Sequence, residues 1–162
     1  MVFRLPKDDS VDYIKRVIGL PGDRIQMRAG RLWINGSELA LKPDGTGTLE
    51  SADGSAYPVA KFVETLPGGV THPILKQTWS GPYDNTGVYV VPAGHLFMMG
   101  DNRDDSLDSR VAAADDGVGY VPVENLVGKA QVIVGSYDYL GVDSLADLVG
   151  KIRGSRFFKT ID

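Results

Sequence analysis

Short apolar runs rich in β-branched and aromatic residues recur along most of the chain, and Gly, Pro, Asn or Asp residues separate them. Runs of this length and composition predict strands rather than helices. The predicted strands cover residues 2–6, 13–20, 24–27, 31–34, 37–41, 59–65, 74–77, 88–91, 96–99 and 126–135. Asn35-Gly36 predicts a tight hairpin between two of them, because both residue types tolerate a positive φ. The pattern therefore predicts a mainly β fold, with antiparallel or mixed sheets that coil toward a barrel.

Two polar segments separate groups of predicted strands. Residues 43–56 contain Pro43-Asp44-Gly45 and Asp53-Gly54, which predicts a polar excursion without regular structure. Residues 80–87 predict a second polar loop. We expect one domain over residues 1–162. Its expected parts are a core (2–42 and 88–137), a β-rich insertion (43–87) and a tail (138–162).

The tail has a different pattern from the rest of the chain. Its apolar residues recur at i, i+3, i+4 and i+7, which predicts one face of a short helix that Asp143 or Ser144 caps and Gly154 ends. These residues are Leu145, Leu148, Val149 and Ile152. Basic residues then gather beside Phe157-Phe158. Two interpretations stay open, a terminal helix packed on the domain and a contact with an anionic membrane surface.

Composition excludes several kinds of chemistry. The 162 residues are 43% hydrophobic and carry a net charge of -4, so we expect a globular domain without a nucleic acid partner. There is no cysteine, which excludes disulfides and thiolate nucleophiles. The two histidines, His72 and His95, are too scattered to predict a metal site, and no cofactor is expected. No apolar run approaches the roughly 18–20 residues that span a bilayer.

Lys15 lies within the apolar run of residues 13–20, where an ammonium group is costly. Burial lowers the pKa of an amine, and a neutral amine can take a proton from a hydroxyl nucleophile. Strand alternation would place Lys15 on one face with Tyr13 and Val17, and Arg16 on the other face. Taken alone, a surface lysine on a half-exposed strand is the simpler interpretation of this run.

The segment from Gly100 to Arg110 directly follows an apolar strand and is dense in polar residues, with four carboxylates, two arginines and two serines. A calcium loop does not fit, because Arg103 stands where the second ligand should be and no glycine occupies the sixth position. The other two interpretations are a solvated polar loop and a set of internally paired charges that fixes one loop geometry. In the second case, a serine hydroxyl could orient a nearby amine.

Together the two stretches resemble the boxes of bacterial type I signal peptidases, which are membrane-anchored serine–lysine endopeptidases that remove signal peptides from exported proteins. The run from Tyr13 to Asp23 resembles the box that contains the family's general-base lysine. The run from Gly100 to Arg110 resembles its most distinctive box, which usually has Asn where this chain has Asp105. Shorter stretches also resemble the family pattern, at residues 2–6, 119–122 and 125–128.

The resemblance implies roles for individual residues. Lys15 matches the general base, and Ser106 matches the serine that orients the lysine. Four charged residues are expected to support the site: Arg16, Asp101, Asp108 and Arg110. Three residues beside the lysine are expected to form part of a peptide-binding wall: Asp12, Tyr13 and Ile14.

The resemblance also implies a substrate and a location. The implied partners are preprotein signal peptides with small residues at the cleavage site. The implied place is the outer face of the bacterial cytoplasmic membrane. A membrane anchor that precedes this sequence would hold the protein there, and the tail is a second candidate contact. Neither a metal nor a cofactor is implied.

The nucleophile is the main departure from the family pattern. The family places it in a Ser-x-Ser-Met-x-Pro box upstream of the stretch that residues 2–6 resemble, and this sequence has no such box. We therefore expect an upstream segment to be missing and this chain to be inactive alone. Ser10 lies in a polar stretch and is expected to be a turn residue. Two other interpretations stay open, a self-cleaving serine–lysine enzyme of the repressor type and a serine-less β-module that binds exported peptides.

Overall fold

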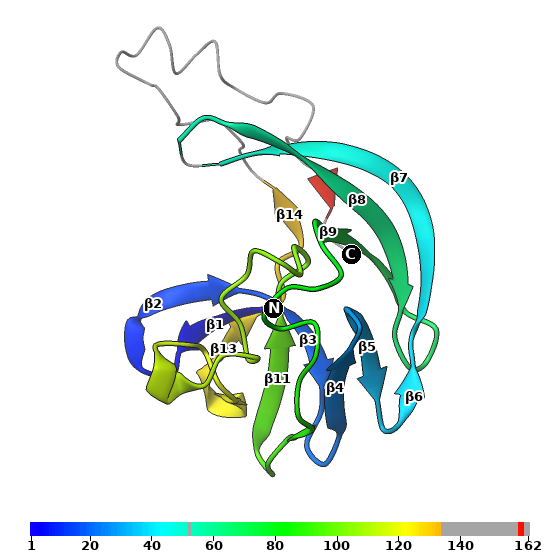
Figure 1. Cartoon of the computed structure of the whole chain (residues 1–162). Helices are drawn as coiled ribbons and strands as arrows, with labels where there is room; N and C mark the ends of the chain where they lie inside the picture. The colour runs from blue at the N-terminus through cyan, green and yellow to red at the C-terminus, as the bar shows by residue number, and fades with distance from the viewer. Residues whose placement is uncertain (52, 134–158, 161–162) are drawn as a thin grey trace, which may run out of the picture.

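The computed structural model describes residues 1–51, 53–133 and 159–160, and strands make up most of the structure there (Figure 1). The prediction of a mainly β fold is confirmed. The paired strands in these residues are antiparallel. Two short 3-10 helices accompany them, η1 (Ala113–Asp115) and η2 (Val123–Asn125). No helix within these ranges is long and apolar enough to cross a membrane.

Three small open sheets surround the interior. The first has the order β13-β1-β2, with bounds Leu126–Gly128, Val2–Leu5 and Asp8–Ile14. The second has the order β10-β4-β5-β6, with bounds Tyr89–Val90, Arg24–Arg28, Arg31–Ile34 and Ser37–Glu38. The third has the order β12-β11-β3, with bounds Val121–Pro122, His95–Met99 and Arg16–Gly19.

A fourth sheet, called here the β7–β9 sheet, is built from β7 (Ala40–Glu50), β8 (Ala56–Thr65) and β9 (Thr71–Lys76). Its long β7–β8 hairpin arches from the right of the view over the top of the molecule (Figure 1). The short strands β14 (Val132–Ile133) and β15 (Lys159–Thr160) pair with each other.

Strand β11 separates two hydrophobic cores because it is buried on both faces. Phe97 and Met99 pack into a core formed mainly by β3, β4 and β5. Leu96 and Met98 pack into a second core with Phe3 of β1. Alternate side chains of a strand point to opposite faces, so a continuous apolar run fits a strand with a core on each side. This burial fixes β11, and with it the point where the polar segment after Met99 begins.

The polar excursion predicted for residues 43–56 is wrong. Most of this segment lies in β7, which pairs with β8 along its length, and of the described residues only 51 and 53–55 lie between the two strands. The ladder shifts register between Pro43 and Thr46, and Gly45 there has a φ of 88°. A bulge accommodates the Pro-Asp-Gly sequence, which therefore marks an irregularity within a strand and not a loop.

The last predicted strand is shorter than expected. Residues 126–135 were predicted as one strand, but β13 ends at Gly128 and β14 begins at Val132. The tail helix predicted around residues 143–154 lies outside the described residues, and so do the basic residues of the predicted membrane contact apart from Lys159, of which only the backbone in β15 is described.

Candidate active site

Antiparallel pairing of β3 with β11 brings the two sequence motifs together. Arg16, the first residue of β3, is opposite Met99, the last residue of β11. Lys15 therefore lies just before one strand, and the segment from Gly100 to Arg110, called here the site loop, begins just after the other. Because both strands are fixed by the cores, the meeting point of the two motifs is fixed as well.

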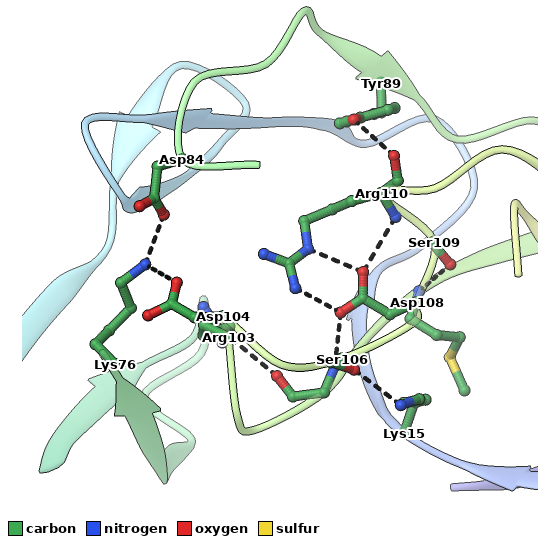
Figure 2. A network of polar contacts seen from close by, with 12 residues as sticks. Lys15, Lys76, Asp84, Tyr89, Arg103, Asp104, Ser106, Asp108, Ser109 and Arg110 are labelled. Carbon is green, nitrogen blue, oxygen red and sulfur yellow. Dashed lines mark hydrogen bonds and ion pairs between the residues drawn. The ribbon is translucent and has the colours of Figure 1, made fainter. Parts of the chain in front are cut away.

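Lys15 contacts Ser106 of the site loop (Figure 2). The Lys15 Nζ donates a hydrogen bond of 2.8 Å to Ser106 Oγ. Burial lowers the pKa of Lys15, although the carboxylate of Asp108 acts in the opposite direction. The amine is therefore easier to deprotonate than an ordinary lysine, as a general base requires.

Gly100 makes room for the serine. A Cβ atom at this position would lie 2.1 Å from Ser106 Oγ, which no side chain could tolerate. The Gly100 N–H donates to Asp108 Oδ2 at 3.0 Å. The glycine thus lets the site loop fold back on itself and brings Ser106 to the lysine.

Two bidentate arginine–aspartate pairs flank this contact. Arg16 donates from Nε and Nη2 to the Asp101 carboxylate at 2.8 and 3.0 Å, near the surface. Arg110 donates from Nε and Nη2 to the Asp108 carboxylate at 2.9 and 2.8 Å, in the interior. All four residues expected to support the site therefore lie beside it, and the partner of Arg16, which the sequence left open, includes Asp101.

The expected separation of Lys15 from Arg16 by strand alternation is wrong. The run 13–20 is not one strand, because β2 ends at Ile14 and β3 begins at Arg16, with Lys15 between them. The Lys15 N–H donates to Met1 O there, and the chain then pairs with β11 instead of β1. The strict two-residue period fails at this change of partner, and Lys15 and Arg16 line one pocket.

This pocket has a volume of about 520 Å³. Its wall combines Ile14, Lys15 and Arg16 with site-loop residues and with Leu66 and Val70 of the β8–β9 turn. Of the three residues expected to bind peptide, Ile14 lines the pocket, whereas Asp12 and Tyr13 lie farther back on β2 and are not part of its wall. Their role stays a prediction. Among the described residues, no group of three or more His, Asp or Glu side chains is arranged to hold a metal ion.

Comparison with known proteins shows which family the chain belongs to. The family model described as "Signal peptidase, peptidase S26" matches residues 1–135. The signal peptidase I of Rickettsia typhi is 41% identical over 177 aligned residues, which cover 99% of this chain and 64% of the relative. That of Rickettsia akari is 46% identical and covers 82% of this chain and 49% of the relative. The chain belongs to the bacterial type I signal peptidases.

The chain is also similar to a solved structure, that of a signal peptidase I from Enterococcus faecalis, with which it shares 25% sequence identity. The match covers 78% of this chain and 88% of that one, with a TM-score of 0.42. The chain spans about half to two thirds of the length of the curated relatives it matches.

In this signal peptidase chain, the sequence motifs did not reveal how the site loop is anchored. Arg103 is buried and donates to both Glu64 oxygens, from Nη1 at 2.9 Å and from Nη2 at 2.5 Å. His72 Nε2 lies 3.2 Å from Glu64 Oε2. Burial raises the pKa of Glu64, but the contacts with His72 and Arg103 outweigh it and lower the pKa to about 2. Glu64 and His72 come from β8 and β9, for which no motif was recognised.

Ser109 and Tyr89 also hold the site loop. Ser109 Oγ accepts a hydrogen bond of 2.8 Å from Met98 N, and the Tyr89 hydroxyl donates to Arg110 O at 3.0 Å. Ser109 lies inside the recognised motif, so the sequence could have indicated that it belongs to the site. Tyr89 belongs to a short strand remote from the motif, and no feature of the sequence pointed to it.

Proposed function

We propose that this chain carries the general base of a serine–lysine endopeptidase that removes signal peptides from exported preproteins. The observation that carries the proposal is the hydrogen bond of 2.8 Å between Lys15 Nζ and Ser106 Oγ, beside a pocket, at a lysine whose pKa is lowered by burial. Lys15 is the base, and Ser106 orients its amine. The proposed nucleophile is a serine that lies outside this sequence, because the Ser-x-Ser-Met-x-Pro box in which the family places it does not occur among residues 1–162.

The proposed reaction has two stages. The nucleophilic serine attacks the scissile carbonyl carbon, and its proton passes to the neutral Lys15 amine. The tetrahedral intermediate then expels the amine of the mature protein, which takes the proton from Lys15, and an acyl-enzyme remains. Water hydrolyses this ester with Lys15 again as the base, which releases the signal peptide and restores both groups.

The charged pairs are proposed to hold this geometry. Asp108 and Arg110 fix the interior of the site loop, and Asp101 fixes Arg16 next to the base. These residues act through Lys15 and Ser106, and we assign them no direct contact with the substrate.

The proposed substrate is an extended peptide with small residues before the cleavage point. Strand β2 is at the edge of its sheet, so its free main-chain groups can add such a peptide as a further strand. Ile14, at the end of β2, would then contact the peptide next to the base, and Asp12 and Tyr13 would lie farther along it. We place this reaction at the outer face of the bacterial cytoplasmic membrane, where exported preproteins emerge.

The test uses the chain extended by the codons that precede Met1 in its gene. If they encode a Ser-x-Ser-Met-x-Pro segment, the extended protein should cleave a peptide with an Ala-x-Ala site. Lys15→Ala should then reduce kcat/KM by at least about a thousandfold, because a nucleophile without its base loses most of its rate. The wild-type kcat/KM should rise with pH through a pKa below that of an ordinary lysine, because only the neutral amine acts as a base.

Two results would contradict the proposal. One is full activity in the Lys15→Ala variant. The other is cleavage by residues 1–162 alone that Ser10→Ala abolishes, which would assign the role of nucleophile to Ser10. If the upstream codons encode no serine box and the chain binds signal peptides without cleaving them, the chain is a serine-less β-module that binds exported peptides and not a peptidase.

A further inference from the structure

The site loop is joined to the β7–β9 sheet through the main chain of β9. Leu75 N donates to Asp101 O at 2.8 Å, and Arg103 N donates to Leu75 O at 3.0 Å. These bonds form a parallel bridge between Leu75 and Asn102. The start of the site loop is thus a short extension of a sheet that lies outside both recognised motifs.

Lys76, the next residue of β9, adds an ionic connection. Its side chain is only 1% exposed, and its Nζ donates to Asp84 Oδ1 and Asp104 Oδ1, each at 2.5 Å (Figure 2). Asp104 is part of the site loop. Its other oxygen, Oδ2, accepts hydrogen bonds from Gln77 N at 2.5 Å and Thr78 N at 3.0 Å. A single carboxylate therefore attaches the site loop to three donors at the end of β9.

Asp84 fixes the other side of Lys76. Its Oδ2 accepts a hydrogen bond of 2.7 Å from Gly81 N, and its carbonyl accepts one of 2.9 Å from Gly30 N in the β4–β5 turn. Lys76 consequently joins the site loop to a part of the fold that the cores already hold. A buried ammonium between two carboxylates retains this geometry strongly, because a separated partner would be left charged and without water.

We propose that Asp104 and Lys76 are positioning residues for the Lys15–Ser106 pair. The inference rests on the proposed function, because it concerns the same base. Asp104 is two residues before Ser106, so its attachment limits how far the serine can move. Ser106 also packs against Gly100, so a shift of Ser106 opens a space directly beside the Lys15 amine.

Loosening of the site loop should change the pKa of Lys15 in one direction. Its pKa is lowered mainly by burial, while Asp108, Asp105 and Asp101 raise it and Arg110 lowers it further. If the site loop loosens, water reaches the amine, the effect of burial weakens and the pKa of Lys15 rises. Loss of a carboxylate charge without loosening of the site loop could not raise the pKa of Lys15, because a carboxylate stabilises an ammonium. A rise in the pKa of Lys15 in Asp104→Ala would therefore indicate a positioning role and not an effect of the lost charge.

The experiment is a pH titration of the Lys15 side-chain NMR signals in the 162-residue chain, with the signals assigned by comparison with Lys15→Arg. We expect the pKa of Lys15 to rise in Asp104→Ala, and we expect faster hydrogen exchange at the Leu75 and Arg103 amides. In Asp105→Ala, which removes the adjacent exposed carboxylate, the pKa should fall instead. Asp116→Ala removes the carboxylate of the exposed Lys7–Asp116 pair and should leave both measurements unchanged.

The outcomes are separable. A folded Asp104→Ala variant in which the pKa of Lys15 is unchanged or lower overturns the inference. If Asp104→Ala does not fold, Asp104→Asn keeps one acceptor oxygen and is titrated in its place, with the same expected direction. An ordinary pKa at Lys15 in the unaltered chain would contradict the proposed base, whereas a lowered pKa that the titrated Asp104 variant leaves in place would contradict only the positioning role.

Discussion

The two arginine–aspartate pairs that flank the Lys15–Ser106 contact share a geometry but differ in burial. Each is bidentate, with distances between 2.8 and 3.0 Å. In the outer pair, the side chains of Arg16 and Asp101 are 18% and 44% exposed. In the inner pair, those of Arg110 and Asp108 are 2% and 0% exposed. Although the hydrogen bonds of the two pairs are alike, loss of one partner should destabilise the fold more in the inner pair. Water can replace a lost partner only in the outer pair.

This difference in burial indicates that the two pairs have different roles in the site loop. Asp108 also accepts hydrogen bonds from the main-chain N–H groups of Gly100 and Arg110, so the inner pair fixes the backbone of the loop. Asp101 has no such bond to its carboxylate among the described contacts, and it fixes the side chain of Arg16 beside the base. We expect inner substitutions to change folding and outer substitutions to change mainly the local electrostatics.

The largest effect is expected for Asp108→Ala. The substitution leaves the Arg110 guanidinium buried without its carboxylate and removes the acceptor of Gly100 N, so the free energy of unfolding should fall by about 3–5 kcal/mol. Denaturant unfolding measures it. In Asp108→Ala/Arg110→Ala, the loss should be smaller than the sum of the two single losses, because no unpaired charge remains. Additive losses would show that the two side chains act independently.

The next largest effect is expected at Glu64, the partner of the other buried arginine, Arg103. It is a dependence of the free energy of unfolding on pH. The pKa of Glu64 is lowered from 4.5 to about 2, so its contribution to stability is complete above pH 4.5 and is lost as the pH falls through 2. A shift of this size corresponds to about 3 kcal/mol. The stability difference between wild type and Glu64→Gln should therefore shrink by roughly that amount between pH 5 and pH 2.

Glu38→Gln is the matched control for this experiment. Glu38 forms an ion pair with Arg31, and both side chains are 38% exposed. The difference between wild type and Glu38→Gln should change little over the same pH range, because water screens an exposed pair. A similar pH dependence in the two variants would show that burial does not distinguish these pairs.

The strands of the core could be predicted from the sequence because each has a local signal. The apolar run at residues 96–99 and the Asn35-Gly36 turn correspond to β11 and to the turn between β5 and β6. Polar composition was a poorer guide, since residues 43–56 were predicted as an excursion but lie mostly in β7. An exposed hairpin can be polar on both faces when pairing between its strands holds it, and composition alone does not show that pairing.

The site was predictable only where its residues lie within one of the two recognised motifs. The motif around Ser106 contains both members of the inner pair, two residues apart, and the Lys15 motif contains Arg16. Glu64 and Lys76 reach the site loop through the β7–β9 sheet, from 39 and 28 residues away in sequence. A lone glutamate or lysine in a strand carries no local signal of such a partner, so tertiary structure was needed to find them.

The smallest effect is expected for Asp101→Ala in the outer pair. The free energy of unfolding should fall by about 0–1 kcal/mol, because water and counterions replace an exposed partner. The measurement is denaturant unfolding at low salt and at 1 M salt, where the screening length is roughly 3 Å. In 1 M salt, the difference between wild type and Asp101→Ala should disappear, while the loss in Asp108→Ala should persist. An Asp101→Ala loss that salt leaves unchanged would mean that the outer pair is anchored like the inner one, through the Asp101 contact with His72 at 3.8 Å.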